Sequence, residues 1–287
     1  MKSKKIKTIV ITAVTGCMLL SVTIVASANG ATGYQTYKES LKNIVATKNA
    51  TITTTFSVKD NGNTTISEAG VEKLEGVNNS SNTKITTGST TKEVETSRID
   101  GQTIVKDGEI YYSGTNNDKM KNKNMEKKID ESSSKTKLGE MIIDTLVGDV
   151  KNQFVVDGDT ISVNLEGAQI PELAKLAISA AVEEKNNKKA NDKVEAGKDG
   201  LKDALNTIPN LKNVDIKSLS MTAKVDGNNL TDNAFKILIT GEDESSVTHE
   251  FEVSSDFAIT DVNSTKADSI DTTGKQVQPM QEKMKRK

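Results

Sequence analysis

Much of the chain alternates apolar and polar positions with a period of two, which is typical of strands with one buried side. The clearest stretch begins at Ala50, and the residues on its apolar side are Ile52, Thr54, Phe56 and Val58. Asn61-Gly62 follows, and this pair tolerates the positive φ angles of a tight hairpin turn. The pattern therefore predicts a strand, a hairpin and a returning strand through residues 64–66.

The same alternation continues through a threonine-rich region. Further strands are predicted at residues 84–87, 92–99, 102–106 and 109–113. Asp100-Gly101 and Asp107-Gly108 separate the last three as two-residue hairpin turns, and Asp157-Gly158-Asp159 predicts another hairpin between residues 153–156 and 160–165. These features indicate an antiparallel meander.

The last third of the chain contains the longest alternating stretch. Between Val214 and Val225 the apolar side changes midway, which predicts a β-bulge or a twist of the strand. Later strands are expected at residues 234–240, 247–254 and 257–262. Residues 269–287 are polar and end in basic side chains, so they are expected to form a tail.

Three segments have the spacing of amphipathic helices. The apolar stripe of the first consists of Tyr34, Tyr37, Leu41, Ile44 and Val45. The second is expected over residues 138–150 and includes Met141, and the third begins at Ile170-Pro171 and includes Leu176. Together the elements predict an α+β fold, a curved antiparallel sheet (half-barrel-like) of long meander strands with helices packed on one face.

The first 28 residues form a segment of a different kind. Four lysines precede an apolar run over residues 9–25, and Ala26-Ser27-Ala28 supplies the small residues that a signal peptidase prefers. Cleavage is expected after Ala28. The segment therefore predicts an exported protein, extracellular or at the cell surface.

Two other interpretations of this segment stay open. Residues 8–28 have about the 20-residue length of a membrane-spanning helix, so an uncleaved leader would tether the protein to the membrane. Val14-Thr15-Gly16-Cys17 loosely resembles a bacterial lipobox, which would place a lipid on Cys17, although the apolar run continues beyond that cysteine.

Composition narrows the expected core and partners. Only 34% of the residues are apolar and 3% aromatic, with no Trp, which favours an aliphatic core and argues against stacking platforms for sugars or bases. Acidic residues number 40 against 38 basic ones, so no general attraction for nucleic acid is expected. Cys17 is the only cysteine and lies in the leader, so the mature protein has no internal disulfide.

Residues 29–268 are expected to form a single domain. Within it, residues 114–137 are nearly free of apolar side chains and contain a cluster of lysines, which predicts an exposed loop. Residues 183–203 are also highly charged and are expected to be a solvated helix or a loop.

The sequence lacks the common catalytic constellations. His249 is the only histidine, so a Ser-His-Asp site would have to use it, and its place among alternating core residues predicts a solvent-facing strand histidine. No zinc, dinucleotide or P-loop motif occurs, and no metal or cofactor is expected. Asp157, Asp159 and residues 261–265 place oxygen atoms at alternate positions, as in calcium loops, but turn chemistry accounts for both.

Several short segments resemble uncharacterised exported proteins of spore-forming Gram-positive bacteria. They are Asp60-Asn61-Gly62, Thr103-Ile104-Val105, Ile143-Asp144-Thr145-Leu146-Val147-Gly148, Gln169-Ile170-Pro171 and Thr273-Gly274-Lys275-Gln276-Val277. The order of the elements also resembles the LolA-like lipoprotein-carrier half-barrels, without a shared motif. That second resemblance implies a half-barrel fold, and neither resemblance supplies a site residue.

These observations favour a non-enzymatic envelope protein that binds a lipid, another apolar ligand or an envelope partner. Candidate lining residues are Phe56, Tyr111, Met141 and Leu176, for which core packing is the competing role. The first alternative is a structural or interaction module that uses the lysine-rich loop or unpaired strand edges to hold cell-wall polymer or another chain. The second is a hydrolase that uses paired carboxylates.

Overall fold

The computed structural model describes residues 32–115, 148–172, 175–176 and 208–280. The first half of the described chain contains α2 (Thr32–Ala46), β1 (Asn49–Asp60), β2 (Asn63–Glu75), β3 (Asn78–Thr87), β4 (Thr90–Ile99), β5 (Gln102–Asp107) and β6 (Ile110–Thr115). The second half contains two short 3-10 helices, η2 (Gly148–Gln153) and η3 (Gly167–Gln169), and the strands β7 (Val155–Asp157), β8 (Thr160–Glu166), β9 (Lys212–Asp226), β10 (Asn229–Glu242), β11 (Thr248–Thr260) and β12 (Val277–Pro279).

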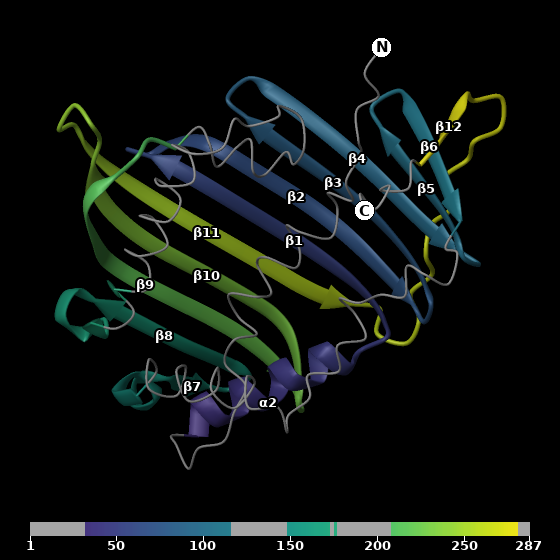
Figure 1. Cartoon of the computed structure of the whole chain (residues 1–287). Coiled ribbons are helices and arrows are strands. Elements are labelled where there is room, and N and C mark those ends of the chain that lie inside the picture. The colour runs from purple at the N-terminus through teal and green to yellow at the C-terminus, as the bar shows by residue number, and fades with distance from the viewer. Residues whose placement is uncertain (1–31, 116–147, 173–174, 177–207, 281–287) are drawn as a thin grey trace, which may run out of the picture.

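All twelve strands form one curved sheet, in the order β12-β6-β5-β4-β3-β2-β1-β11-β10-β9-β8-β7 (Figure 1). Every neighbouring pair is antiparallel except β12 with β6, which is parallel. The end strands β7 and β12 do not pair with each other, so the sheet stays open. The predicted fold class, a curved antiparallel sheet of long meander strands, is confirmed.

The tight turns lie where the Asn-Gly and Asp-Gly pairs predict them. Asn61 and Gly62 have φ angles of 50° and 81°, and Asp100 and Gly101 have 51° and 79°. Both residues of each turn are left-handed, as a type I′ hairpin requires. These turns fix the register of β1 with β2 and of β4 with β5.

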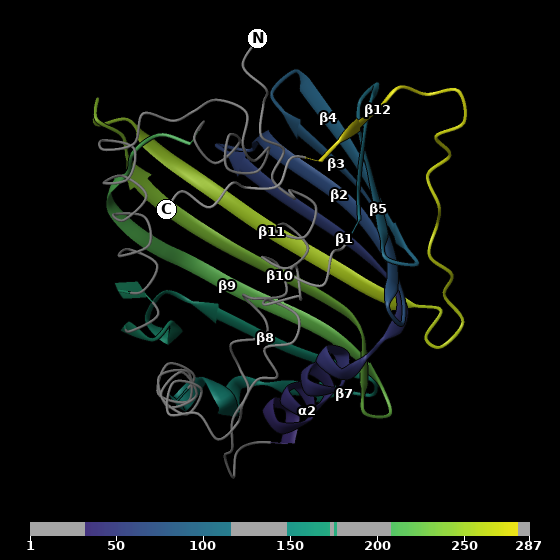
Figure 2. The same ribbon diagram turned by 45° about the vertical axis from the view of Figure 1, so that its right-hand side comes forward.

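The alternation along β1 separates the two faces of the sheet. Thr54 and Val58 are buried, whereas Thr53 and Thr55 are exposed. We call the side of Thr54 the inner face; it is the concave side that also carries α2 (Figure 2). The opposite side is the outer face. Long threonine-rich strands therefore have one buried side, as a half-buried sheet requires.

The predicted bulge in the last third is present in β9. The pairing of β9 with β10 shifts between Leu238 and Ile239, so that Ile216 and Met221 both reach the inner face although their positions differ by an odd number. The apolar side of the sequence changes here because an extra residue reverses which side chains point inward.

Helix α2 covers one end of the inner face, against β7, β9 and β10 (Figure 1). Its predicted apolar stripe is confirmed at Tyr34, Tyr37 and Leu41, which are all at most 2% exposed. The Tyr37 hydroxyl donates a 2.9 Å hydrogen bond to the Asn233 side chain of β10. This end of the inner face holds the main apolar cluster, which includes Ile161.

The residues after β11 do not form a free tail. We call residues 261–280 the C-terminal strap. It crosses the outer face, where the backbone N–H of Thr265 donates to Asn49, that of Asp268 donates to Ser80, and the hydroxyl of Ser97 donates to the carbonyl of Asp268. It then ends in β12 beside β6. Within the predicted tail over residues 269–287, residues 277–279 thus form a strand of the sheet.

Two predicted strands, 247–254 and 257–262, form the single strand β11. The polar residues between them predicted a break. Instead, the hydroxyl groups of Ser254 and Ser57 lie 2.8 Å apart, and Thr55 donates a 3.1 Å hydrogen bond to Asp256. These polar residues continue the strand because they pair with β1 on the outer face.

Other predictions lie partly or wholly outside the described residues. The leader with Ala26, Ala28 and Cys17, the lysine-rich loop from residue 116 onward, the helix with Met141 up to residue 147, and the charged segment 183–203 are all among them. Residues 148–150 of that second helix belong to the 3-10 helix η2.

Candidate functional site

Polar side chains occupy buried positions on the inner face of β1 to β4. We call four of them the inner-face polar set: Thr54, Glu68, Thr83 and Thr96. Their exposed fractions are 3%, 5%, 4% and 8%. Because an inner-facing strand position normally carries an apolar residue, this set departs from the pattern that forms the rest of the core.

The sheet register brings the set together. Gly70 of β2 pairs with Thr54 of β1 on one side and with Thr83 of β3 on the other. Only a glycine therefore separates the two threonine side chains. Glu68 lies between Phe56 and Ile85 in the next row. Thr96 lies on β4 opposite Ser81, in the row on the other side of Thr83. The polar set therefore forms a continuous area over four strands.

Each member of the set has a polar atom without a hydrogen-bond partner. These atoms are Oγ1 of Thr54, Thr83 and Thr96 and Oε2 of Glu68. Buried polar groups in proteins are nearly always paired, and an unpaired one costs about 1–3 kcal/mol. Four such atoms lie on one surface of the sheet, within four neighbouring strands.

Glu68 is the one member that ionises. Burial raises the pKa of its carboxyl group from 4.5 to about 7, and no cation among the described residues lowers it. Glu72, on the same strand, differs: burial also raises its pKa, but the Arg98 guanidinium acts in the opposite direction. Lys92 is paired with Asp107 at 3.2 Å. Glu68 is therefore a carboxyl group of this inner surface whose ionised form no described cation stabilises.

An apolar cluster lies next to Glu68 on the same face. It is formed by Val58, Ile66, Leu211 and Phe251, with Phe56 packed against it. Ile66 is the next inward-facing residue of β2 toward the β1–β2 turn, and it is fully buried. The carboxyl group of Glu68 therefore lies at the boundary between an apolar surface and the three threonine hydroxyl groups.

The four predicted lining residues are not brought together. Phe56 is on the inner face beside Glu68, as expected. Tyr111 is on the outer face, where Lys275 of the strap lies 5.8 Å from its ring centroid, and Tyr112 occupies the inner position instead. Leu176 is 58% exposed, and Met141 lies outside the described residues. The prediction for Tyr111 fails because adjacent strand residues face opposite sides.

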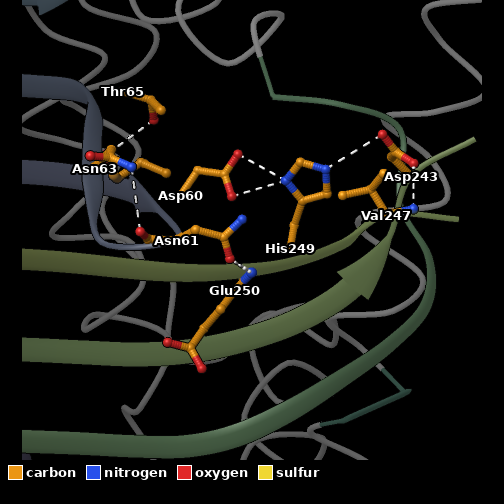
Figure 3. Close-up of polar contacts among 9 residues, drawn as sticks. Asp60, Asn61, Asn63, Thr65, Asp243, Val247, His249 and Glu250 are labelled. Atoms are coloured by element: carbon orange, nitrogen blue, oxygen red, sulfur yellow. Dashed lines mark hydrogen bonds and ion pairs between the residues drawn. The ribbon is translucent and has the colours of Figure 1, made fainter. Parts of the chain in front are cut away.

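A second polar cluster lies at the rim of the inner face (Figure 3). We call Asp60, Asp243 and His249 the rim cluster. Nδ1 of His249 lies 2.9 Å from both carboxylate oxygens of Asp60, and Nε2 lies 3.5 Å from Oδ2 of Asp243. The cluster joins the β1–β2 turn to the β10–β11 turn.

His249 is not the solvent-facing residue that the sequence predicts. Its side chain is only 15% exposed and stacks on the ring of Phe251, with 5.6 Å between the ring centroids. The β10–β11 turn makes this possible, because Asp243 accepts hydrogen bonds from the backbone N–H groups of Ser245 and Val247 and so holds its carboxylate near the ring.

Both ring nitrogens of His249 face carboxylates. Hydrogen bonding to Asp60 raises the pKa of His249, partly offset by desolvation, and Asp243 acts in the same direction as Asp60. The pKa of Asp243 is lowered, mainly by the backbone N–H of Val247. This arrangement favours the protonated form of the imidazole between the two carboxylates, and it connects the two turns.

The predicted calcium-like segments are turns. Asp157-Gly158-Asp159 joins β7 to β8, and the carbonyl of Asp261 accepts hydrogen bonds from Ser264 and Thr265. In the part of the chain that the structure describes, no group of three His, Cys, Asp or Glu side chains is placed to hold a metal ion. No helix within that part has the length and apolar character needed to cross a membrane.

Comparisons with known proteins do not assign a family. No family model matches the sequence, and no curated protein matches it. One similar solved structure is Rv2717c from M. tuberculosis, with 7% identity over 81% of this chain and 99% of that chain and a TM-score of 0.22. Another is a putative thioesterase II from Thermobifida fusca, with 6% identity over 83% and 90% of the two chains and a TM-score of 0.10. At these TM-scores neither likeness bears on function.

Proposed function

We propose that this protein is an exported, non-enzymatic binding protein of the cell envelope that holds an amphipathic lipid on the inner face of its sheet. One observation carries the proposal: four buried polar atoms of the inner-face polar set have no hydrogen-bond partner among the described residues. A bound ligand with a polar group would supply those partners.

The surroundings of the set favour an amphipathic ligand over a purely polar one. Ile66 and Val58, on the adjacent inner positions of β2 and β1, are almost completely buried and belong to the neighbouring apolar cluster. An aliphatic chain packed beside this cluster would gain about 25 cal/mol for each Å² of its own apolar area removed from water. Its polar end would lie near Glu68 and Thr83.

The rim cluster supports a binding role over a catalytic one. His249 is the only histidine of the chain, and both of its ring nitrogens are directed at carboxylates. The proposal that the protein is exported rests on the leader. Its basic start, apolar run and Ala26-Ser27-Ala28 triplet have the pattern of a signal peptide.

Native mass spectrometry of the protein purified from its own cells tests this function. The expected spectrum contains the polypeptide together with bound lipid masses. Phe56→Lys, on the inner face, should lose these masses, whereas Thr55→Lys, the next residue on the outer face, should keep them. If the protein carries no lipid even after incubation with a lipid extract, the inner face is not a lipid site. The same conclusion follows if both variants retain the lipid masses equally.

A second candidate function uses the edge of the sheet. Val155 and Val156 of the edge strand β7 are 60% and 48% exposed, and no other described strand pairs with the free side of β7. An unpaired apolar edge accepts a strand from another protein chain. Val155→Lys should then abolish an association that is detectable by analytical ultracentrifugation, and an unchanged sedimentation profile would exclude this candidate.

A further inference from the structure

The chemistry of the polar set restricts the headgroup of the ligand. This inference rests on the proposed function, since it concerns the same surface. Glu68 is 5% exposed, lies between Phe56 and Ile85, and has an Oε2 atom without a hydrogen-bond partner. A carboxylate in such a place is costly unless a cation or several donors approach it.

The protein itself supplies no such cation among its described residues. The positive groups on the inner face of the strands next to Glu68 are Lys92 and Arg98. Lys92 makes an ion pair with Asp107, and Arg98 acts electrostatically on Glu72. Farther along the same face, His249 is held between Asp60 and Asp243. Among the described residues, Lys92, Arg98 and His249 each lie near a carboxylate other than that of Glu68.

We propose that Glu68 binds the primary ammonium group of an amphiphile whose aliphatic chain lies along the neighbouring apolar cluster. An ammonium group has three donors and no acceptor, so one N–H would reach Oε2 of Glu68. The Oγ1 atoms of Thr54 and Thr83 lie on the adjacent row and would accept the others. A phosphate or carboxylate headgroup would instead bring a second negative charge toward Glu68.

Binding should therefore displace a proton. In the free protein, burial keeps a large part of Glu68 protonated near pH 6, since its pKa is raised to about 7. An ammonium group beside the carboxyl stabilises its ionised form, so the pKa falls and the proton passes to the buffer. Calorimetry at pH 6 in two buffers of different ionisation enthalpy measures this release directly.

Decylamine and decanol form the test pair, because they share one chain and differ in the headgroup. We expect the wild-type protein to bind decylammonium at least tenfold more tightly than decanol, with proton release at pH 6. Glu68→Gln preserves the shape of the side chain and should remove both the preference and the release while decanol binding persists. Glu93→Gln, on the exposed outer face of β4, should retain both.

Each other outcome has a definite meaning. Equal binding of the amine and the alcohol by the wild-type protein would overturn the ammonium assignment and leave the proposed lipid function standing. A preference that survives in Glu68→Gln would assign the headgroup to another residue and would also overturn it. Failure of both ligands to bind would contradict the proposed function itself.

Discussion

The carboxyl group of Glu68 ionises at different pH values in the folded and unfolded chains. Its folded pKa is about 7 against an ordinary value of 4.5, because burial disfavours the charge. The unfolded chain therefore loses its proton first as the pH rises. The free energy of unfolding should fall between these two values and stay low above them.

Glu68→Gln should remove this loss. At pH 8 we expect the ligand-free variant to be more stable than the wild type by on the order of 2 kcal/mol, and at pH 4.5 the two should be nearly equal. Urea unfolding at the two pH values measures both differences. An equal stability difference at pH 4.5 and pH 8 would show that the carboxyl group is not desolvated in the folded protein.

His249 contributes to stability in a lower pH range. Its folded pKa is raised, mainly by Asp60, so its contribution is fully present below about pH 6.5 and is lost as the pH rises through the folded value. His249→Gln should cost about 1–2 kcal/mol at pH 5.5 and less at pH 8.5. Glu250→Gln, exposed on the same strand, is the matched control and should show no such difference.

Thermal unfolding of these two variants beside the wild type at both pH values provides the measurement. A cost for His249→Gln that is independent of pH would assign the effect to the ring stacking on Phe251 instead of the charge. Only the difference between variant and wild type is informative, because Glu68 adds its own pH dependence to both proteins.

At the residue scale, the sequence predicts which side of a strand a residue faces better than it predicts the residue's partners. The alternation predicts the inward direction of Phe56. It does not decide between Tyr111 and Tyr112, because either tyrosine could occupy an inner position, and Tyr112 is the one that does. The contact of His249 with Asp60 joins positions 189 residues apart, and no local pattern contains it.

Among the elements, the C-terminal strap replaces what would otherwise be an exposed edge at β6. Its backbone and side chains hydrogen-bond to strands β1, β3 and β4 on the outer face, and β12 pairs with β6. The side chain of Met280 packs against the cluster of Val94 and Val105. The strap therefore connects the middle of the sheet to its edge.

A chain that ends at residue 264 should lose these contacts. We expect a loss of several kcal/mol in the free energy of unfolding, since more than three part-buried hydrogen bonds and an edge strand disappear. Self-association is also expected, because β6 becomes an unpaired edge. A chain that ends at Met280 is the control and should behave like the full protein in chemical denaturation and size-exclusion chromatography.

The opposite result would assign the strap a different role. If the chain ending at residue 264 unfolds at the same denaturant concentration as the full protein, the contacts of Thr265 and Asp268 with the sheet do not contribute to stability.

The element that the sequence predicts least well is the β2–β3 hairpin. The alternation predicts β2 only up to about residue 66 and β3 only from residue 84, yet the two strands pair from Ile66 with Thr87 to Glu75 with Asn78. The missing part contains Glu68, Glu72, Ser81 and Thr83, which face inward. The pattern failed there because polar residues occupy inner positions, and these are the residues of the candidate site.

For the whole molecule, the two parts of the inner face have different character. The end formed by β8, β9 and β10 is apolar and covered by α2, as in an ordinary core (Figure 1). The middle, on β1 to β4, is buried but carries hydroxyl and carboxyl groups without partners. The fold class was predictable because turns and alternation are local signals, whereas this division depends on the register of twelve strands.

Photo-crosslinking tests the central claim, that the inner face of β1 to β4 binds an amphiphile, most directly. A decylamine derivative with a diazirine on its chain is irradiated with the wild-type protein, and the modified residues are located by peptide mass spectrometry. We expect labels on inner-facing residues near Glu68, such as Phe56 and Ile66, and their loss with excess decylamine. Labels confined to outer-face positions such as Thr53 and Thr55, or labelling that decylamine does not reduce, would contradict it.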